Sequence, residues 1–268
     1  MARFKYGWTE EKIERFIKDG RGTGRGKDYT PWLTTQDVPS RGRSHRVALP
    51  KTGRQHHFLS DNEFYAFLDM ALDADVTDIR EQYPLDRKET IAIAAAKKIK
   101  HPAYKGTPIV MTTDFVETRM GPHGYSERAI SIKPDEELKE GRTIEKLEIE
   151  RSYWSRRGVP WFIRLASDLK TTRSLNLEWI FDNTLEGDAD PIDEENVLQQ
   201  LPAGLDLHHD QPIREMCTWL DSRLQFEPGR ALQITRRLLG SRRVIVDLTK
   251  PMLSEQPCKN FTIRAGLS

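Results

Sequence analysis

Three polar side chains interrupt two apolar runs that are otherwise typical of buried strands. The stretch VMTTDFVETRMGPHGYSERAISIKP, residues 110–134, carries Asp114 in its first apolar run and Ser131 and Lys133 in its second. A charged group in a sheet core costs free energy unless it is paired or bound to a metal. Because side chains alternate along a strand, Ser131 and Lys133 share one face. That face is therefore not ordinary core.

The segments around these strands alternate between helix and strand patterns. Thr9 is a helix cap, and Gly20 follows that helix. Apolar residues at helical spacing predict helices, and short apolar runs bounded by turn residues predict strands. Helices are expected near residues 10–19, 60–72, 90–100 and 142–157, and strands near residues 76–84, 108–116, 128–133 and 159–165. This order is typical of a small α/β domain with a mixed sheet.

The helix over residues 142–157 carries both an inward stripe and several acids. The stripe consists of Ile144, Leu147, Arg151 and Trp154. Three acids, Glu145, Glu148 and Glu150, interleave with basic residues and are interpreted as a solvated helix face. Glu150 is also a candidate outer-shell residue if this helix flanks a cleft.

Composition changes after Leu165, which indicates a second domain. Helices are expected at residues 175–181, 212–226 and 228–240, an exposed acidic connector at 182–195, and a short hairpin from VIVDL and NFTIRAG. Helices followed by a β wing suggest a winged-helix-like domain. Its last helix is rich in arginine, which fits either DNA reading or docking to a protein partner.

Charge and composition limit the function classes. The chain has 268 residues and a formal net charge of +1, but residues 1–57 hold 13 Lys and Arg against 6 Asp and Glu. Such a basic segment suits a polyanion. No apolar run approaches the roughly 20 residues of a membrane span, and the first residues lack a signal-peptide core. Cys217 and Cys258 have no metal-ligand spacing, as expected for a reduced cytosolic protein.

Two other sequence features are weaker candidates for a site. The run GRGTGRGKDYTPW lacks the Walker spacing and follows a helix, so it is neither a phosphate loop nor a dinucleotide fingerprint. A flexible basic segment on a nucleic-acid backbone and an ordinary loop both remain open. The adjacent pairs His56-His57 and His208-His209 do not share a helix face and are interpreted as surface residues.

The polar strand residues can build a metal-dependent nuclease site. Asp114 beside Lys133 would supply a carboxylate for a hard cation such as Mg²⁺ and an ammonium for a phosphodiester. A second acid is needed, and Glu63 on the helix before the first strand is the candidate. Simpler interpretations exist: Ser60 and Glu63 form a capping box, and Asp114 and Lys133 a structural ion pair.

The residues that carry a family resemblance extend from Trp8 to about Leu165. The blocks are, in order, GRGTGRGKDYTPWLTTQDVPSRGRSHR, KTGRQHHFLSDNE, DIREQYPL, IKHP, MTTDF, IKP, and IEKLEIERSYW followed by PWFI. In these blocks the sequence resembles the TnsA family, the endonuclease subunits of the heteromeric transposases of Tn-seven-type bacterial elements. The resemblance implies a restriction-endonuclease-like catalytic domain with a mixed sheet over residues 1–168. It also implies a smaller winged-helix-like C-terminal domain over residues 169–268.

The resemblance further implies an activity, a cofactor and partners. The activity is Mg²⁺-dependent cleavage of the 5′ strands, the non-transferred strands, in double-stranded DNA at transposon ends; Mn²⁺ is expected to substitute. The partners are a DDE-type transposase subunit and an AAA+ ATPase regulator, in the bacterial cytoplasm and on the nucleoid during transposition. No membrane is implied.

The family's site residues carry over to five positions of this chain. The catalytic residues are Glu63, Asp114 and Lys133, and the metal ligands are Glu63, Asp114, the Ser131 side chain and the Ile132 carbonyl. Ser131 departs from the pattern, because the family usually has glutamine there. This departure keeps open a catalytically weak or inactive nuclease-fold module that bridges the transposase assembly. A free-standing nuclease is the third hypothesis.

Overall fold

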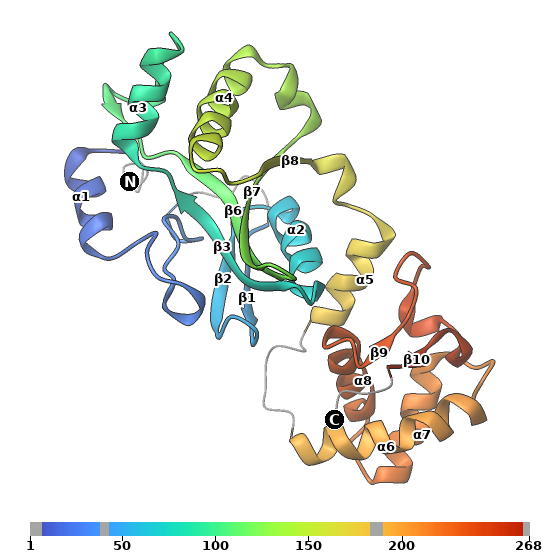
Figure 1. Cartoon of the computed structure of the whole chain (residues 1–268). Coiled ribbons are helices and arrows are strands. Elements are labelled where there is room, and N and C mark those ends of the chain that lie inside the picture. Colours follow the sequence, from blue (N-terminus) through green and yellow to red (C-terminus); the bar gives the residue numbers. More distant parts are fainter. Residues whose placement is uncertain (1–6, 38–42, 183–189, 265–268) are drawn as a thin grey trace, which may run out of the picture. The chain divides into compact units, whose positions relative to one another are not determined.

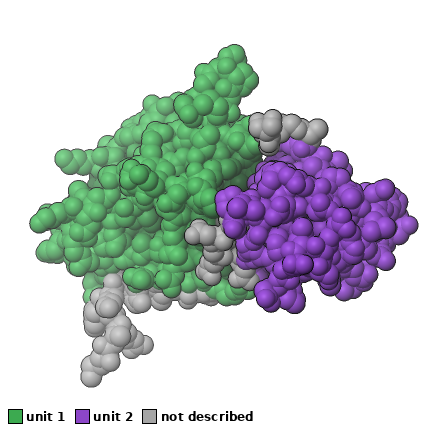
Figure 2. All heavy atoms as spheres, turned by 90° about the horizontal axis from the view of Figure 1, so that it is seen from below, with its two compact units in different colours: residues 1–169 green, residues 170–268 purple. Residues whose placement is uncertain are grey.

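The computed structural model describes residues 7–37, 43–182 and 190–264. Residues 1–169 and residues 170–268 form two compact units, coloured separately in Figure 2. In the part of the chain that is described, no helix is long and apolar enough to cross a membrane.

Four strands of the N-terminal unit form one mixed sheet in the order β3-β6-β7-β8 (Figure 1). Both β3 with β6 and β6 with β7 pair antiparallel, and β7 pairs with β8 in parallel. The predicted mixed sheet is therefore confirmed. The four strands are β3 (Val76–Pro84), β6 (Thr112–Gly121), β7 (Gly124–Lys133) and β8 (Trp161–Leu165).

The other elements of this unit surround the sheet. The predicted helices are present, and the predicted cap Thr9 accepts a hydrogen bond from the Lys12 backbone N–H at 3.2 Å. The elements are α1 (Glu10–Lys18), η1 (Gly26–Asp28), β1 (His45–Leu49), β2 (Arg54–Phe58), α2 (Asp61–Leu72), α3 (Arg87–Ala96), β4 (Ala103–Tyr104), β5 (Thr107–Pro108), η2 (Asp135–Lys139), α4 (Gly141–Arg156) and η3 (Ala166–Asp168).

The two faces of the sheet are covered by different layers. On one face, Val116 of β6 packs in a buried cluster with Ile149 and Trp154 of α4. On the other, the ring of Phe115 lies 6.0 Å from that of Phe58 on β2, which also contacts α2. Since adjacent strand residues point to opposite faces, α4 lies on one side and the β1–β2 pair with α2 on the other.

The burial of α4 differs from the predicted stripe. Leu147 and Trp154 are buried as expected, but Ile144 is 47% exposed and Arg151 is exposed as well. The stripe prediction is wrong at these two positions. The buried face turns instead toward Ile149 and Tyr153, which pack against α3 and the sheet.

The glycine-rich basic segment is an ordered turn packed on β3. Gly22 has φ 77°, and a Cβ there would lie 2.0 Å from the Pro84 ring. Gly24 has φ 89°, and a Cβ there would lie 2.2 Å from the Asp28 carbonyl oxygen. Only glycine fits both the conformation and the space. The close packing favours the ordinary-loop interpretation, and contact of this segment with a nucleic-acid backbone stays a prediction.

The C-terminal unit is mainly helical. Its elements are α5 (Thr172–Phe181), α6 (Pro191–Leu207), α7 (Ile213–Leu224), α8 (Arg230–Gly240), β9 (Val244–Ile245), η4 (Leu253–Glu255), η5 (Cys258–Asn260) and β10 (Thr262–Ile263). Strands β9 and β10 pair antiparallel over two residues each, with two 3-10 turns between them rather than a tight hairpin turn. The last two residues of NFTIRAG lie outside the described residues. The winged-helix arrangement stays a prediction.

The acidic connector prediction is wrong from residue 191 onward. Residues 183–189 lie outside the described part, but α6 begins at Pro191. Asp190 caps it by accepting from the Ile192 backbone N–H at 2.9 Å, and Asp193 and Glu194 occupy its first turn. Acids favour the positive end of a helix dipole, so this charge run begins a helix.

Candidate active site

Strands β6 and β7 separate where the polar residues lie. Their last registered pair at this end is Phe115 with Ile130. Beyond it, the Ile132 backbone N–H donates to Asp114 Oδ2 at 2.6 Å. A carboxylate thus takes the position of a backbone acceptor, which explains how the strand tolerates Asp114.

The side chains around Asp114 do not follow strict alternation. Thr113 Oγ1 donates to Glu150 Oε1 at 2.6 Å and accepts from Trp154 Nε1 at 2.8 Å, so Thr113 faces α4. Phe115, two residues later, faces the opposite layer. The strand therefore switches faces at Asp114.

Lys133 lies against two oxygens of the predicted site. Its Nζ donates to the Ile132 carbonyl at 2.8 Å and lies 3.4 Å from Asp114 Oδ2. The Asp114 carboxylate raises the pKa of Lys133 above its ordinary value. Lys133 is therefore a fixed positive charge here rather than a proton acceptor.

Glu63 makes the hydrogen bonds of a helix-capping residue, and it also has the raised pKa that is typical of a residue in an active site. Its N–H donates to Ser60 Oγ at 3.2 Å, and its Oε2 accepts from the Leu59 N–H at 2.9 Å, so Ser60 and Glu63 do support the start of α2. Burial, together with the Asp114 carboxylate, raises the pKa of Glu63 to about 8. Glu63 is thus close enough to Asp114 to interact with it.

Ser131 is directed toward α4. Its Oγ donates to Glu150 Oε1 at 2.5 Å and accepts from Trp161 Nε1 at 3.1 Å. Glu150, one of these two partners, is close enough to Asp114 to interact with it electrostatically. The predicted metal role of Ser131 stays a prediction, and its hydroxyl is already engaged.

Sequence reasoning gave Glu150 two interpretations, a solvated helix face and an outer-shell residue of a cleft. Glu150 is only 5% exposed, so the solvated-face interpretation is wrong for it. Burial and the nearby Asp114 raise its pKa above the ordinary value. The signal was available: position 150 lies three residues after Leu147 and four before Trp154, on the buried stripe.

The oxygens around Asp114 fit a hard cation. The Lys133 ammonium stands between the Asp114 carboxylate and the Ile132 carbonyl, so these oxygens already face one positive charge. Carboxylate and carbonyl oxygens are ligands that Mg²⁺ accepts. Among the described residues, however, no three His, Cys, Asp or Glu side chains converge on one metal position. Glu63 and Glu150 approach Asp114 electrostatically without completing such a group.

A pocket of about 290 Å³ opens beside Lys133 on the α4 side. Its polar lining holds the cations Lys133 and Lys146, the acids Glu137 and Glu150, and the hydroxyls of Thr112 and Thr143. The two basic side chains are thus matched by two acidic ones, so the pocket by itself does not single out a phosphate-bearing ligand.

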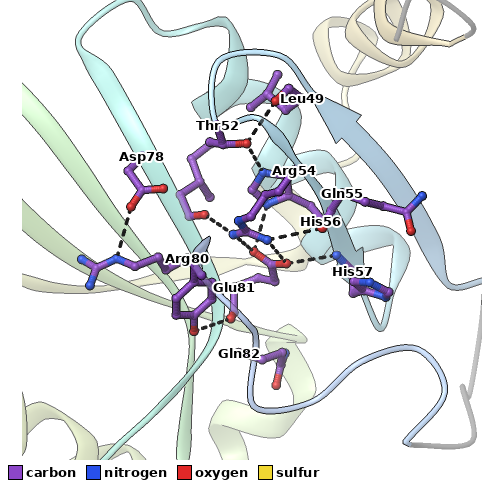
Figure 3. Close-up of polar contacts among 12 residues, drawn as sticks. Leu49, Thr52, Arg54, Gln55, His56, His57, Asp78, Arg80, Glu81 and Gln82 are labelled. Atoms are coloured by element: carbon purple, nitrogen blue, oxygen red, sulfur yellow. Dashed lines mark hydrogen bonds and ion pairs between the residues drawn. The ribbon is translucent and has the colours of Figure 1, made fainter. Parts of the chain in front are cut away.

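A buried cluster of charged side chains links the β1–β2 pair to β3. Figure 3 shows Arg54, His56 and the His57 backbone converging on the Glu81 carboxylate of β3. Arg54 Nη2 lies 2.5 Å and His56 Nδ1 2.9 Å from Glu81 Oε2, and Glu81 is fully buried. Burial alone would raise the pKa of Glu81, but the hydrogen bond from Arg54 and the contacts with His56 lower it to about 2. The surface prediction is wrong for His56, because this carboxylate pairs with it in the core.

The raised pKa of Glu63 predicts a pH-dependent stability in metal-free solution. The folded state binds this proton more tightly than the unfolded chain, whose Glu63 has the ordinary value of 4.5. The stabilising contribution is complete below that value and is lost as pH rises through about 8. Urea unfolding at a series of pH values should show this loss. Glu63→Gln should lack this part of the pH dependence, and an unchanged slope would contradict the assignment.

A mixed sheet with helices on both faces is consistent with an α/β nuclease-like domain. A family model described as TnsA-like endonuclease N terminal matches residues 73–165, and one described as TnsA endonuclease C terminal matches residues 168–248. The chain is 42% identical over 244 residues to the transposon Tn7 transposition protein TnsA of Escherichia coli. That match covers 90% of this chain and 87% of the relative. The chain therefore belongs to the TnsA family of endonucleases.

Proposed function

We propose that this chain is the endonuclease subunit that hydrolyses the 5′, non-transferred strands at transposon ends. It acts with a DDE-type transposase subunit and an AAA+ ATPase regulator, and it requires Mg²⁺. The observation that carries the proposal is the meeting of Asp114, the Ile132 carbonyl and Lys133 where β6 and β7 separate. Family membership supports a role in transposition.

Each site residue has a distinct task in this proposal. Asp114, Glu63 and the Ile132 carbonyl would hold Mg²⁺, which when bound supplies positive charge to offset that of the phosphate and leaving oxygen. Lys133 places its ammonium at the scissile phosphate and stabilises the charge that develops on it. Since the pKa of Lys133 is raised, it contributes as a cation and not as a base.

The groove beside the site gives the DNA backbone a path. Lys146 lies on the exposed side of α4 and lines the same pocket as Lys133. In this proposal the two cations contact DNA phosphates without reading base sequence, while Glu137 and Glu150 in the same pocket limit the attraction. The end sequence is then recognised by the partner transposase.

Strand-specific cleavage tests this function directly. DNA carrying a transposon end, labelled on each strand in turn, is incubated with Mg²⁺, the partner transposase and this chain. The expected product is a cut in the 5′ strand that needs both proteins and disappears when Mg²⁺ is chelated. Cutting without the transposase would instead indicate a free-standing nuclease.

The engagement of Ser131 by Glu150 and Trp161 favours one alternative function. If that position supplies no ligand, metal binding weakens, and the chain serves as an inactive nuclease-fold module that bridges the assembly. Formation of the complete assembly with no 5′ cut, and no binding of Mg²⁺ or Mn²⁺ by calorimetry, would support this alternative.

A further inference from the structure

Gln82 has a backbone conformation that its place in the sheet does not explain. It lies inside β3 with φ 48°, and it is 3% exposed. The other non-glycine residues with positive φ in the described part lie in turns, at helix ends or next to a 3-10 turn. A left-handed residue in a strand costs free energy and persists only where the surroundings require it.

This conformation makes β3 change faces opposite Asp114. The Glu81 side chain faces β2, whereas the ring of Tyr83 lies 5.6 Å from that of Trp154 on α4. A regular strand would put residues 81 and 83 on one face. Glu81 is registered with Phe115 and Tyr83 with Thr113, so Gln82 stands opposite Asp114, where β6 makes the same switch.

The side chain of Gln82 is aimed at the other carboxylate of the site. Its Nε2 donates to Glu63 Oε2 at 3.4 Å, and its Oε1 accepts from Thr112 Oγ1 at 3.4 Å. Its backbone carbonyl accepts from the Trp32 N–H at 3.2 Å. The amide therefore connects the start of α2 with the start of β6, on either side of Asp114.

We propose that Gln82 is a positioning residue for the cleavage reaction: its amide holds the Glu63 carboxylate beside Asp114, and its left-handed backbone aims the amide. This inference rests on the proposed function, in which Glu63 and Asp114 hold the metal. Gln82 itself touches neither substrate nor metal. An amide suits the task because it donates to a carboxylate without adding a third negative charge.

Two variants distinguish a role of Gln82 in positioning Glu63 from a role in folding. Gln82→Gly removes the amide but adopts positive φ without strain, and this relief offsets part of the stability lost with a buried side chain. Gln82→Asn keeps an amide and tolerates positive φ, but it is one methylene too short to reach Glu63. Lys105→Gly is the matched control, because Lys105 has φ 47° in the exposed turn between β4 and β5.

The measurements are unfolding by urea without metal, binding of Mn²⁺ alone by calorimetry, and 5′-strand cleavage in the complete assembly. In both Gln82 variants the affinity for Mn²⁺ should fall by about 10-fold to 100-fold relative to the unchanged chain, and the rate of 5′-strand cleavage should fall by a similar factor. Losses of this size are typical when a group that orients a metal ligand is removed. Lys105→Gly should change neither. If Gln82→Gly proves unstable, Gln82→Asn decides the question. Wild-type Mn²⁺ affinity in Gln82→Asn would overturn the proposal.

Asp114→Asn distinguishes failure of this inference from failure of the proposed function. If Mn²⁺ binds the unchanged chain but not Asp114→Asn, the metal site stands and the Gln82 variants test positioning alone. If Mn²⁺ binding is absent from the unchanged chain, or is equal in Asp114→Asn, the proposed metal site fails and the role of Gln82 fails with it.

Discussion

Asp114→Asn is expected to slow 5′-strand cleavage by at least about 100-fold, as for removal of a group that stabilises transition-state charge. Asparagine keeps an oxygen that can accept from the Ile132 N–H, so the local backbone should persist. It loses the negative charge that faces Lys133 and that would hold the cation. Rates of 5′-strand cutting on labelled transposon-end DNA, with the partner transposase and Mg²⁺, measure the effect.

The control for this prediction is Asp75→Asn. Asp75 is an exposed acid beside Arg119, at the opposite end of β3 from the site, so its loss should leave cleavage unchanged. Assembly with the partners and the unfolding midpoint should be the same for both variants. Equal 5′ cutting by Asp114→Asn and the unchanged chain would place the active site elsewhere.

The second large effect is on stability. Glu81→Gln is expected to lower the free energy of unfolding of the N-terminal unit by about 3 to 5 kcal/mol, because it leaves a buried charge without its partner. That charge is the Arg54 guanidinium, whose side chain is 6% exposed and which bonds both oxygens of Glu81. Urea denaturation followed by tryptophan fluorescence measures the loss.

Glu145→Gln is the matched control for the buried cluster. Glu145 pairs with Arg142 on the exposed face of α4, and such surface pairs contribute about 1 kcal/mol or less. The two substitutions remove the same charge from the same residue type, so their difference reports burial. If Glu81→Gln were no more destabilising than Glu145→Gln, the cluster would not be what fixes the β1–β2 pair on β3.

The sequence predicted the helices and the four sheet strands of the N-terminal unit because their signals are local, but it did not predict the β1–β2 pair. Thr9 ahead of α1 and Ser60 ahead of α2 act within one helical turn. The order of these elements was enough for a mixed α/β sheet. Period-two alternation likewise put Ser131 and Lys133 on one face, and both do face the α4 side.

The same local reasoning failed for buried polar residues whose hydrogen-bond partners are distant in the sequence. Glu150 looks solvated beside its charged neighbours, yet Thr113 and Ser131, from two different strands, hydrogen-bond to it in the core. His56 has no motif around it, and only the folded sheet brings Glu81 to its ring. A buried polar group is stable only with its partner, and the partner is distant in sequence.

The sequence by itself determined the candidates for the chemistry, since Glu63, Asp114 and Lys133 follow from their residue types, their places on predicted elements and the family blocks. Only the tertiary structure decided how they meet. β3 and β6 both leave regular alternation, at Gln82 and Asp114, and this switch is invisible in a one-dimensional pattern. The physical reason is that a left-handed residue in a strand is unfavourable locally and is maintained only by packing from both faces of the sheet.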